Sequence, residues 1–144
     1  SYKHLRGSNN LFKPVLSWRT RIAQIKELKA DEYIGYGCTF KTTSKSKIVV
    51  LPIGYYDGYN RSISNRGYML INGHRAQIRG RICMNICMAD ISDIQKVKLN
   101  QEVTIIGRDQ KETVTAENLA DWGGTINYEI LASLSCATPR IITK

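Results

Sequence analysis

The chain has 144 residues, of which 42% are hydrophobic and 23% charged, a composition typical of an ordinary globular protein. These values exclude a collagen, a coiled coil and a disordered chain, and the longest uncharged apolar run, residues 48–54, is far shorter than the ~20 residues of a membrane helix. The net charge of +9 is concentrated in residues 1–81, which carry 15 basic and 4 acidic side chains. Such a bias indicates either a solvated face balanced by a partner domain or a surface that binds anions.

The first part of the chain predicts a connection followed by two strands. Residues 1–14 are polar and irregular, and we expect a connecting segment there. Over residues 15–28 apolar and polar side chains alternate with a period of two, which predicts a strand. Residues 47–53 form a β-branched run near Pro52 and Gly54, which predicts a strand buried on both faces. A polar loop over residues 55–65 follows.

The middle of the chain predicts a hairpin and two further strands. Asn72-Gly73 separates residues 68–71 from residues 75–78, and this pair suits a two-residue hairpin turn with positive φ at both positions. Residues 81–88 and 102–106 read as strands, and residues 107–110 as a turn toward Val114.

The spacing of apolar residues changes from that of strands to that of helices only near the C-terminus, where two short helices are expected. Thr115 is a suitable cap for a helix that stops at Gly123, and Thr125 for a second helix. One face of the second helix would carry Ile126, Ile130 and Leu134.

The last residues, after Pro139, predict a return to strand at residues 141–142. The elements together predict a mainly β fold, a small barrel or sandwich with two short helices near the C-terminus, forming one domain over residues 15–144.

Cysteine and histidine spacing favours no metal site. The four cysteines lack CxxC spacing and the two histidines are isolated, so we assign no metal. Cys83 and Cys87 would lie ~13 Å apart along the predicted strand, too far for a disulfide. A reducing, cytoplasmic setting fits this pattern best.

Tyrosine is the residue type with the most uneven distribution. Five of the eight tyrosines fall between positions 33 and 59, namely Tyr33, Tyr36, Tyr55, Tyr56 and Tyr59. They suit half-buried positions at a barrel rim, or one phenol serves as an acid or base near the cations Arg61 and Arg81. Tyr36 is the strongest candidate because flanking glycines let backbone or ligand approach closely.

Two other interpretations of the basic and aromatic residues remain open. Residues 79–85 also fit a strand end with arginines that extend their charged groups to solvent. A small basic β barrel with exposed tyrosines also suits single-stranded nucleic acid, because the rings stack on bases and the cations follow phosphates.

Five stretches occur in order along the chain, with the sequences PVLSWRTRI, IGYGCT, PIGYYDG, GRICM and TINYE. Together they resemble the C-terminal domain of the alanine racemases over nearly the whole chain. The resemblance implies a pyridoxal-phosphate enzyme that interconverts L- and D-alanine for peptidoglycan and works as a head-to-tail homodimer. It also implies an N-terminal (β/α)8 barrel domain that holds the cofactor and is missing from this chain, so this domain alone is expected to be inactive.

The resemblance also implies roles for individual residues. Tyr36 matches the family's catalytic tyrosine, which acts on one face of the substrate Cα in the partner subunit's active site, opposite the cofactor lysine. Met84 matches a residue whose backbone amide holds the substrate carboxylate, and Tyr55 a phenol that lines the site. Tyr128 matches a tyrosine near the cofactor phosphate. Residues along the channel through which the substrate enters are matched by Arg61, Arg81 and Ile126.

Three positions depart from the family pattern. Asn85 stands where Asp is usual, Tyr56 where Ala is usual, and Ala137 where Arg is usual. These departures leave the choice between alanine and serine open. A serine racemase of the vancomycin-resistance type is therefore the alternative within the same enzyme class.

Overall fold

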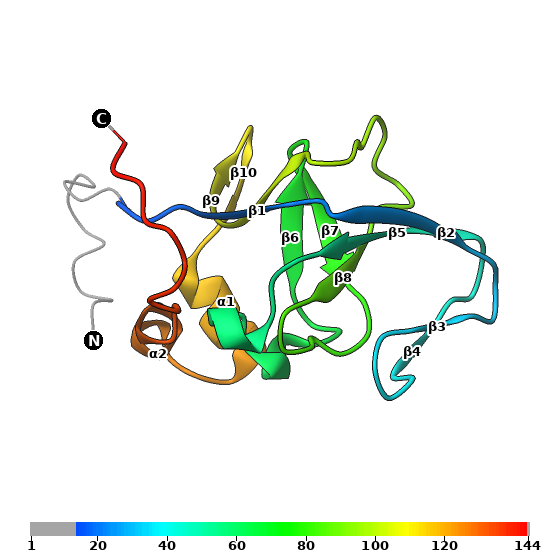
Figure 1. The fold of residues 1–144 in the computed structure, drawn as a ribbon, viewed down its shortest axis with the longest axis horizontal. Coiled ribbons are helices and arrows are strands. Elements are labelled where there is room, and N and C mark those ends of the chain that lie inside the picture. The colour runs from blue at the N-terminus through cyan, green and yellow to red at the C-terminus, as the bar shows by residue number, and fades with distance from the viewer. Residues whose placement is uncertain (1–13, 144) are drawn as a thin grey trace.

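The computed structural model describes residues 14–143, so the connection expected over residues 1–14 lies almost wholly outside it. One large sheet, a small hairpin, short 3-10 helices and two α-helices make up the described part (Figure 1). The strands are β1 (Trp18–Arg21), β2 (Gln24–Leu28), β3 (Tyr33–Ile34), β4 (Phe40–Lys41), β5 (Ser46–Leu51), β6 (Tyr68–Ile71), β7 (His74–Ile78), β8 (Cys87–Asp90), β9 (Glu102–Asp109) and β10 (Glu112–Val114). The helices are η2 (Tyr55–Asp57), η3 (Arg61–Ile63), α1 (Ala116–Gly123) and α2 (Asn127–Ala132).

The two end strands of the large sheet, β1 and β2, are consecutive in the chain, and this connection curls the sheet round on itself. Its strand order is β1-β9-β6-β7-β8-β5-β2, with β10 added to β9. Consecutive strands β1 and β2 therefore lie at opposite ends of the order, joined only by Ile22 and Ala23. The Ile22 amide donates to Gln101 O on one side, and the Ala23 amide to Val50 O on the other, both at 3.0 Å. The predicted mainly β, barrel-like fold with two short late helices is confirmed.

The predicted alternation at the start of the chain is confirmed, although it spans two strands. Trp18 and Ile22 are buried, whereas Arg19 and Arg21 are exposed. Inward-facing apolar side chains of the other strands complete one core, including Val49, Leu51, Met69, Leu70, Ile71, Ile78, Ala89, Val103 and Ile105. The barrel interior is thus filled by side chains, as in other small barrels.

The predicted hairpin is confirmed. β6 and β7 pair antiparallel, and the turn residues Asn72 and Gly73 have φ values of 54° and 71°. Positive φ at both positions matches the twist of the flanking strands. The strand at residues 47–53 is confirmed as β5, in which Ile48, Val49 and Leu51 are buried.

The strand predicted over residues 81–88 is wrong for most of its length, because β8 begins only at Cys87. The backbone just before β8 pairs with the segment that forms η2. Cys83 O and Met84 O accept hydrogen bonds from the amides of Tyr55 and Tyr56, both at 3.0 Å. The extended spacing assumed between Cys83 and Cys87 therefore does not apply. All four cysteines are free thiols.

The turn predicted at residues 107–110 is also misplaced. β9 continues through Gly107 to Asp109, and β10 pairs back onto it after a turn at residues 110–111. Gly107 has a φ of 127°, and a Cβ there would lie 2.8 Å from Ser17 Oγ. Glycine thus allows the strand to pass close to the start of the chain.

The first helix begins as predicted and the second does not. The Asn118 amide donates to Thr115 Oγ1 at 3.3 Å, and the glycine with positive φ that caps α1 is Gly124 rather than Gly123. Ile126, not Thr125, occupies the N-cap of α2, and the Thr125 hydroxyl donates to the Glu129 carboxylate.

The apolar face predicted for the second helix is only partly present, and the strand predicted after Pro139 is absent. Ile130 is buried, but Ile126 is exposed. Ile141 and Ile142 are exposed and lie outside any strand. Within residues 14–143, no helix has the length and apolar character needed to cross a membrane.

Candidate functional site

Tyr36 projects from the tight turn between β3 and β4. Gly35 and Gly37, on either side of it, both have a φ of 77°, a conformation that costs glycine little and other residues more. The Tyr36 side chain is 73% exposed. Within the described residues its hydroxyl has no hydrogen-bond partner, so it is available to a group outside this chain.

The Tyr36 turn lies directly on the loop that carries Arg81. A Cβ at Gly37 would lie 3.0 Å from Arg81 Nη1, and a Cβ at Gly35 would lie 3.2 Å from Arg81 N. On the facing loop, a Cβ at Gly80 would lie 2.5 Å from Ile34 O. The glycines therefore bring the two backbones into contact that side chains would prevent.

A second close approach joins η2 to Met84. A Cβ at Gly54 would lie only 2.1 Å from Cys83 O and 2.3 Å from Met84 O, so this position requires glycine. Tyr55 and Tyr56 follow, with exposed rings and amides bound to the same two carbonyls. The Met84 amide N–H has no acceptor within residues 14–143.

Arg61 and Arg81 line one open depression together with Ser62 and Ser64. Neither guanidinium has a carboxylate partner among the described residues. Other arginines are paired, as in Arg19–Glu102, Arg75–Glu112 and Arg79–Asp90. Two uncompensated cations beside hydroxyl groups form a surface that attracts anions.

Sequence reasoning missed Asn65, which connects these loops. Its Oδ1 accepts a hydrogen bond from the Gly80 amide at 2.6 Å, and its Nδ2 donates to Thr39 Oγ1 at 3.4 Å. Asn65 has a φ of 60°, a left-handed conformation that asparagine tolerates better than most residues. An asparagine at the end of a long loop was the only signal in the sequence.

The structure therefore brings five of the predicted site residues into one group of three loops, which we call the loop cluster: residues 34–39, 54–65 and 79–86. These five are Tyr36, Tyr55, Arg61, Arg81 and Met84. Tyr56 and Asn85, two of the departures from the family pattern, are exposed in the same cluster.

Tyr128 and Ile126 belong instead to α2, which packs on the cluster by its other end. Ser133 Oγ donates to Gly58 O at 3.3 Å, and the Ser135 amide donates to Asp57 O at 3.2 Å. Both Tyr128 and Ile126 are exposed.

Arg79 attaches the β3–β4 hairpin to the large sheet. Its guanidinium lies 4.6 Å from the centre of the Phe40 ring, and its Nε lies 3.6 Å from Asp90 Oδ2 without a hydrogen bond. The side chain is half-buried, so it does not simply extend into solvent. This contact fixes the base of the hairpin whose tip carries Tyr36.

Tyr59 differs from the other tyrosines of the cluster because it is fully buried. Its ring packs edge-on against Trp18 at 6.1 Å, and its hydroxyl has no hydrogen-bond partner among residues 14–143. Burial raises the pKa of Tyr59 well above its usual 10.0, with a smaller contribution from Cys87. Burial likewise raises the pKa of the Cys87 thiol. Both groups stay neutral and belong to the core.

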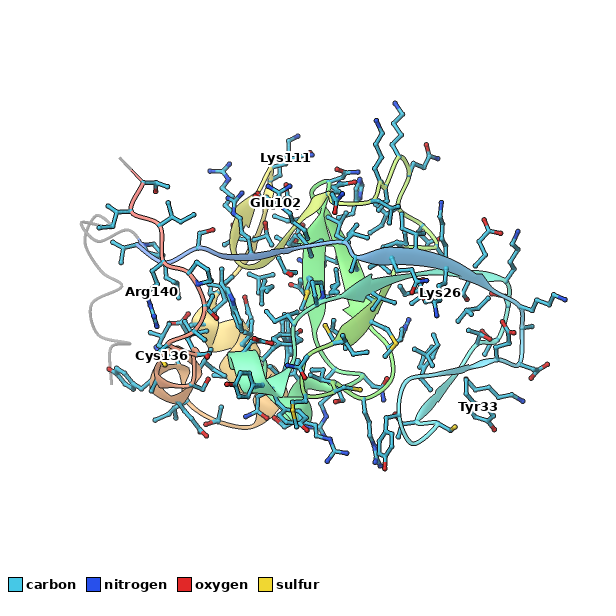
Figure 2. The ribbon with its side chains drawn as sticks, in the orientation of Figure 1. Lys26, Tyr33, Glu102, Lys111, Cys136 and Arg140 are labelled. Atoms are coloured by element: carbon cyan, nitrogen blue, oxygen red, sulfur yellow. The ribbon has the colours of Figure 1, made fainter. Side chains whose placement is uncertain are left out.

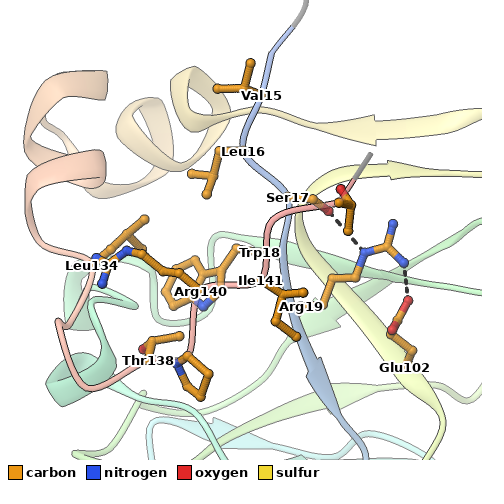
Figure 3. Close-up of a pocket in the computed structure, with 12 residues that line it drawn as sticks. Val15, Leu16, Ser17, Trp18, Arg19, Glu102, Leu134, Thr138, Arg140 and Ile141 are labelled. Atoms are coloured by element: carbon orange, nitrogen blue, oxygen red, sulfur yellow. Dashed lines mark hydrogen bonds and ion pairs between the residues drawn. The ribbon is translucent and has the colours of Figure 1, made fainter.

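A groove of about 660 Å³ lies at the end of the molecule opposite the β3–β4 hairpin, between the start of β1 and the C-terminal tail (Figure 1 and Figure 3). Leu16, Trp18 and Leu134 line it with the Arg19–Glu102 ion pair, and none of the predicted site residues does. Arg140 and Cys136 lie at this end, away from Tyr33 on the hairpin (Figure 2). Ala137, the third departure from the family pattern, is exposed, and its amide donates to Ser135 Oγ at 3.3 Å.

The described part of the chain contains no set of side chains suited to bind a metal ion. No three His, Cys, Asp or Glu side chains gather there. The chemistry the loop cluster offers is that of exposed phenols, unpaired guanidinium groups and a free backbone amide.

Comparison with known proteins gives a consistent result. Residues 15–142 match the model of the family described as alanine racemase, C-terminal domain. The chain is 46% identical over 140 residues to an alanine racemase of Leptospira interrogans and 43% identical over 142 residues to one of Clostridium perfringens. These matches cover 96% and 99% of this chain but 36% and 37% of the relatives. The chain thus spans about a third of the length of the curated relatives it matches.

Solved structures agree. The alanine racemase of Bacillus anthracis with bound L-Ala-P superposes with a TM-score of 0.80 at 36% identity, covering 85% of this chain and 31% of that one. The alanine racemase of Oenococcus oeni superposes with a TM-score of 0.88 at 28% identity, covering 96% of this chain and 38% of that one.

Proposed function

Because the chain belongs to the family of alanine racemase C-terminal domains, we propose that it is the C-terminal domain of an alanine racemase that interconverts L- and D-alanine with pyridoxal phosphate, for peptidoglycan synthesis in the cytoplasm. The observation that carries the proposal is the family match over residues 15–142. It is supported by the exposure of Tyr36, which the resemblance matches to the family's catalytic tyrosine.

The role proposed for Tyr36 is proton transfer on one face of the substrate Cα. Racemisation needs one group to remove the Cα proton and another to return a proton on the opposite face. A phenol suits this role only if it reaches the substrate, and the Tyr36 hydroxyl is free of internal partners. The second group is the cofactor lysine of a (β/α)8 barrel domain in the longer protein. The family resemblance implies that this tyrosine acts in the barrel of the partner subunit of a head-to-tail homodimer, and the exposure of Tyr36 leaves it accessible to such a partner.

The residues of this chain fit a cofactor held mainly by another domain. Tyr128 is 58% exposed and its hydroxyl has no partner within residues 14–143, so it suits a contact with the cofactor phosphate. Pyridoxal phosphate, when bound, acts as an electron sink that makes the substrate Cα proton acidic. Since Tyr36 and Tyr128 alone complete no site, we expect the isolated domain to be inactive.

The substrate carboxylate has three suitable contacts in the loop cluster. The free amide of Met84 is a hydrogen-bond donor without an acceptor, and a carboxylate satisfies it. The unpaired guanidinium groups of Arg61 and Arg81 attract the carboxylate inward. Tyr55 lines the site, and the exposed Ile126 lines the channel through which the substrate enters.

The relatives named above are alanine racemases, so neither serine racemisation nor nucleic-acid binding gains support from them. Turnover of L-serine by the full-length protein that equals or exceeds turnover of L-alanine would contradict the proposed substrate.

The decisive experiment assays the full-length protein, loaded with pyridoxal phosphate, in both directions. Tyr36→Phe removes only the hydroxyl, and we expect racemisation to fall by about 10²–10⁴-fold, the contribution of general acid–base catalysis, with cofactor content unchanged. Tyr33→Phe is the matched control, because Tyr33 is exposed on the same hairpin and is not assigned to the site. Equal activities of the two variants would reject Tyr36 as the catalytic residue.

The size of the native protein provides an independent test. A (β/α)8 barrel adds ~250 residues, so an immunoblot of source cells should show a soluble band near ~45 kDa. A band close to the 16.3 kDa of this chain would mean that no barrel is attached. A much larger band in the membrane fraction would favour the serine-racemase type.

A further inference from the structure

The strongest unassigned feature of the loop cluster is the pair Ser64 and Asn65, which follows η3. The Asn65 side chain bonds in two directions, to the Gly80 amide at 2.6 Å and to Thr39 Oγ1 at 3.4 Å. Thr39 belongs to the segment that carries Tyr36, and Gly80 precedes Arg81. A single side chain thus joins the two loops that hold the proposed catalytic and substrate-binding groups.

Ser64 completes the attachment on the other side of Arg81. Its Oγ accepts a hydrogen bond from the Ile82 amide at 2.9 Å. The residues immediately before and after Arg81 are therefore both bound by this pair. Its own backbone is held by η3, where the Ser64 amide donates to Arg61 O at 3.1 Å.

The packing around these hydrogen bonds leaves little room for the loops to shift. Gly80 lies against Ile34 and Gly35 so closely that a Cβ would approach Ile34 O to 2.5 Å. Any displacement of Gly80 therefore moves either Arg81 or the start of the Tyr36 turn.

We propose that Ser64 and Asn65 are positioning residues that hold the Tyr36 turn and the Arg81 loop in fixed relation to each other. This inference rests on the proposed function, in which Tyr36 moves the Cα proton and Arg81 attracts the carboxylate. The proposed action of the pair is indirect, although the Ser64 side chain also lines the depression beside Arg61 and Arg81. Ser64 and Asn65 act through Thr39 on one loop and through Gly80 and Ile82 on the other.

The two branches of the pair have different kinetic consequences. Loss of the bond to Thr39 loosens the Tyr36 turn, which lowers kcat because the proton-transfer group is misplaced. Loss of the bond from Ser64 to Ile82 loosens the Arg81 loop, which raises KM because a binding group is misplaced. A merely structural role would lower the amount of active enzyme in every variant and leave KM unchanged.

The test uses the full-length, cofactor-loaded protein and three variants. Thr39→Val removes the acceptor with little change of shape, and we expect kcat to fall about 10-fold with KM nearly constant. Ser64→Ala should raise KM for L-alanine about 10-fold with kcat nearly constant. Asn65→Gly keeps the left-handed backbone and removes both side-chain bonds, so kcat should fall and KM should rise together, since ~1 Å of misplacement costs up to ~100-fold.

Asn72→Gly is the matched control. Asn72 also has a positive φ, accepts a bond from Gln101 Nε2 at 2.5 Å and donates to Gln95 O at 3.2 Å, but it lies in the β6–β7 turn. We expect its kcat and KM to match those of the wild type. If Asn65→Gly behaves like Asn72→Gly, the proposed positioning role is wrong.

Hydrogen exchange separates failure of this inference from failure of the proposed function. In Asn65→Gly, but not in Asn72→Gly, the Gly80 amide, which loses its acceptor, should exchange at least 10-fold faster. If the wild type does not racemise alanine, the proposed function fails, and the exchange rates alone decide whether the pair holds the loop. Unchanged exchange in Asn65→Gly would overturn the inference whatever the activity.

Discussion

Tyr36 and Tyr59 lie in the same tyrosine-rich stretch, yet they represent two different regions of the molecule. Tyr36 stands at the tip of a hairpin, 73% exposed, with an available hydroxyl, whereas Tyr59 is fully buried and packs on Trp18. At Tyr36 the exposed hydroxyl is the group that can interact outside the domain. At Tyr59 the ring is the group that packs in the barrel core. One residue type is therefore available for chemistry in one region and serves packing in the other, and only the fold decides which.

Among variants of the barrel core, the largest change in the free energy of unfolding is expected when a central side chain is truncated. Ile105 on β9 is fully buried in the cluster of strand residues. Ile105→Ala should lower the free energy of unfolding by about 2–5 kcal/mol, because it loses apolar contact and leaves a cavity. Urea titration of the full-length protein measures this change, and KM and kcat of the folded fraction should stay unchanged. A loss below about 1 kcal/mol would mean that the core tolerates a cavity there.

A smaller effect, opposite in sign, is expected when Tyr59 loses its hydroxyl. The buried Tyr59 hydroxyl has no hydrogen-bond partner in the described part of the chain, so Tyr59→Phe removes an unsatisfied polar group and should stabilise the protein by up to about 1–3 kcal/mol. Activity should be retained, in contrast to Tyr36→Phe. Destabilisation by Tyr59→Phe, measured by urea titration at pH 8, would show that the hydroxyl does have a partner.

Wild type and Tyr59→Phe should also differ in how their free energy of unfolding changes at alkaline pH. Burial raises the pKa of Tyr59 well above 10.0, so the folded state keeps the proton that the unfolded chain releases near pH 10. The stability that depends on the neutral phenol is present below pH 10 and is lost as the pH rises toward the pKa of the folded state. Wild type should therefore lose more stability between pH 8 and 10.5 than Tyr59→Phe. Cys87 remains in both proteins, so its own titration cancels in the comparison.

The smallest change in stability or activity is expected for an exposed ion pair that belongs neither to the loop cluster nor to the barrel core. Glu27 and Lys45 form an exposed ion pair at 2.8 Å, in which hydrogen bonding and charge lower the pKa of Glu27 and raise that of Lys45. Exposed pairs contribute little because water and salt screen them. Glu27→Gln should leave the melting temperature and both kinetic constants unchanged within error. A clear drop in melting temperature at low salt would contradict this expectation.

The sequence predicts the barrel better than the loop cluster, for a physical reason. The hairpin at Asn72-Gly73 and the alternation around Trp18 are local patterns, and the structure confirms both. The strand predicted over residues 81–88 is wrong because Cys83 O and Met84 O bond to amides about thirty residues earlier. No local pattern reveals such a distant partner.

The same limit applies to the candidate site. Tyr36 is suggested by its flanking glycines and by the family resemblance, and the structure confirms only that it is exposed and beside Arg81. Asn65 was missed because its bonding partners lie 15 and 26 positions away. Residues that act by connecting loops become visible only when the loops have been placed.

The continuous stretch from β1 to β2 also constrains the order in which the barrel can fold. Ser17 Oγ donates to Ile106 O across 89 positions, so the start of β1 leaves the ribosome long before β9 is made. The β6–β7 hairpin, whose contacts are local, is able to form early, whereas barrel closure waits for contacts as distant in sequence as Ser17–Ile106. Folding of this domain should therefore be limited by loop closure rather than by hairpin formation, with Trp18 among the last core side chains to be covered.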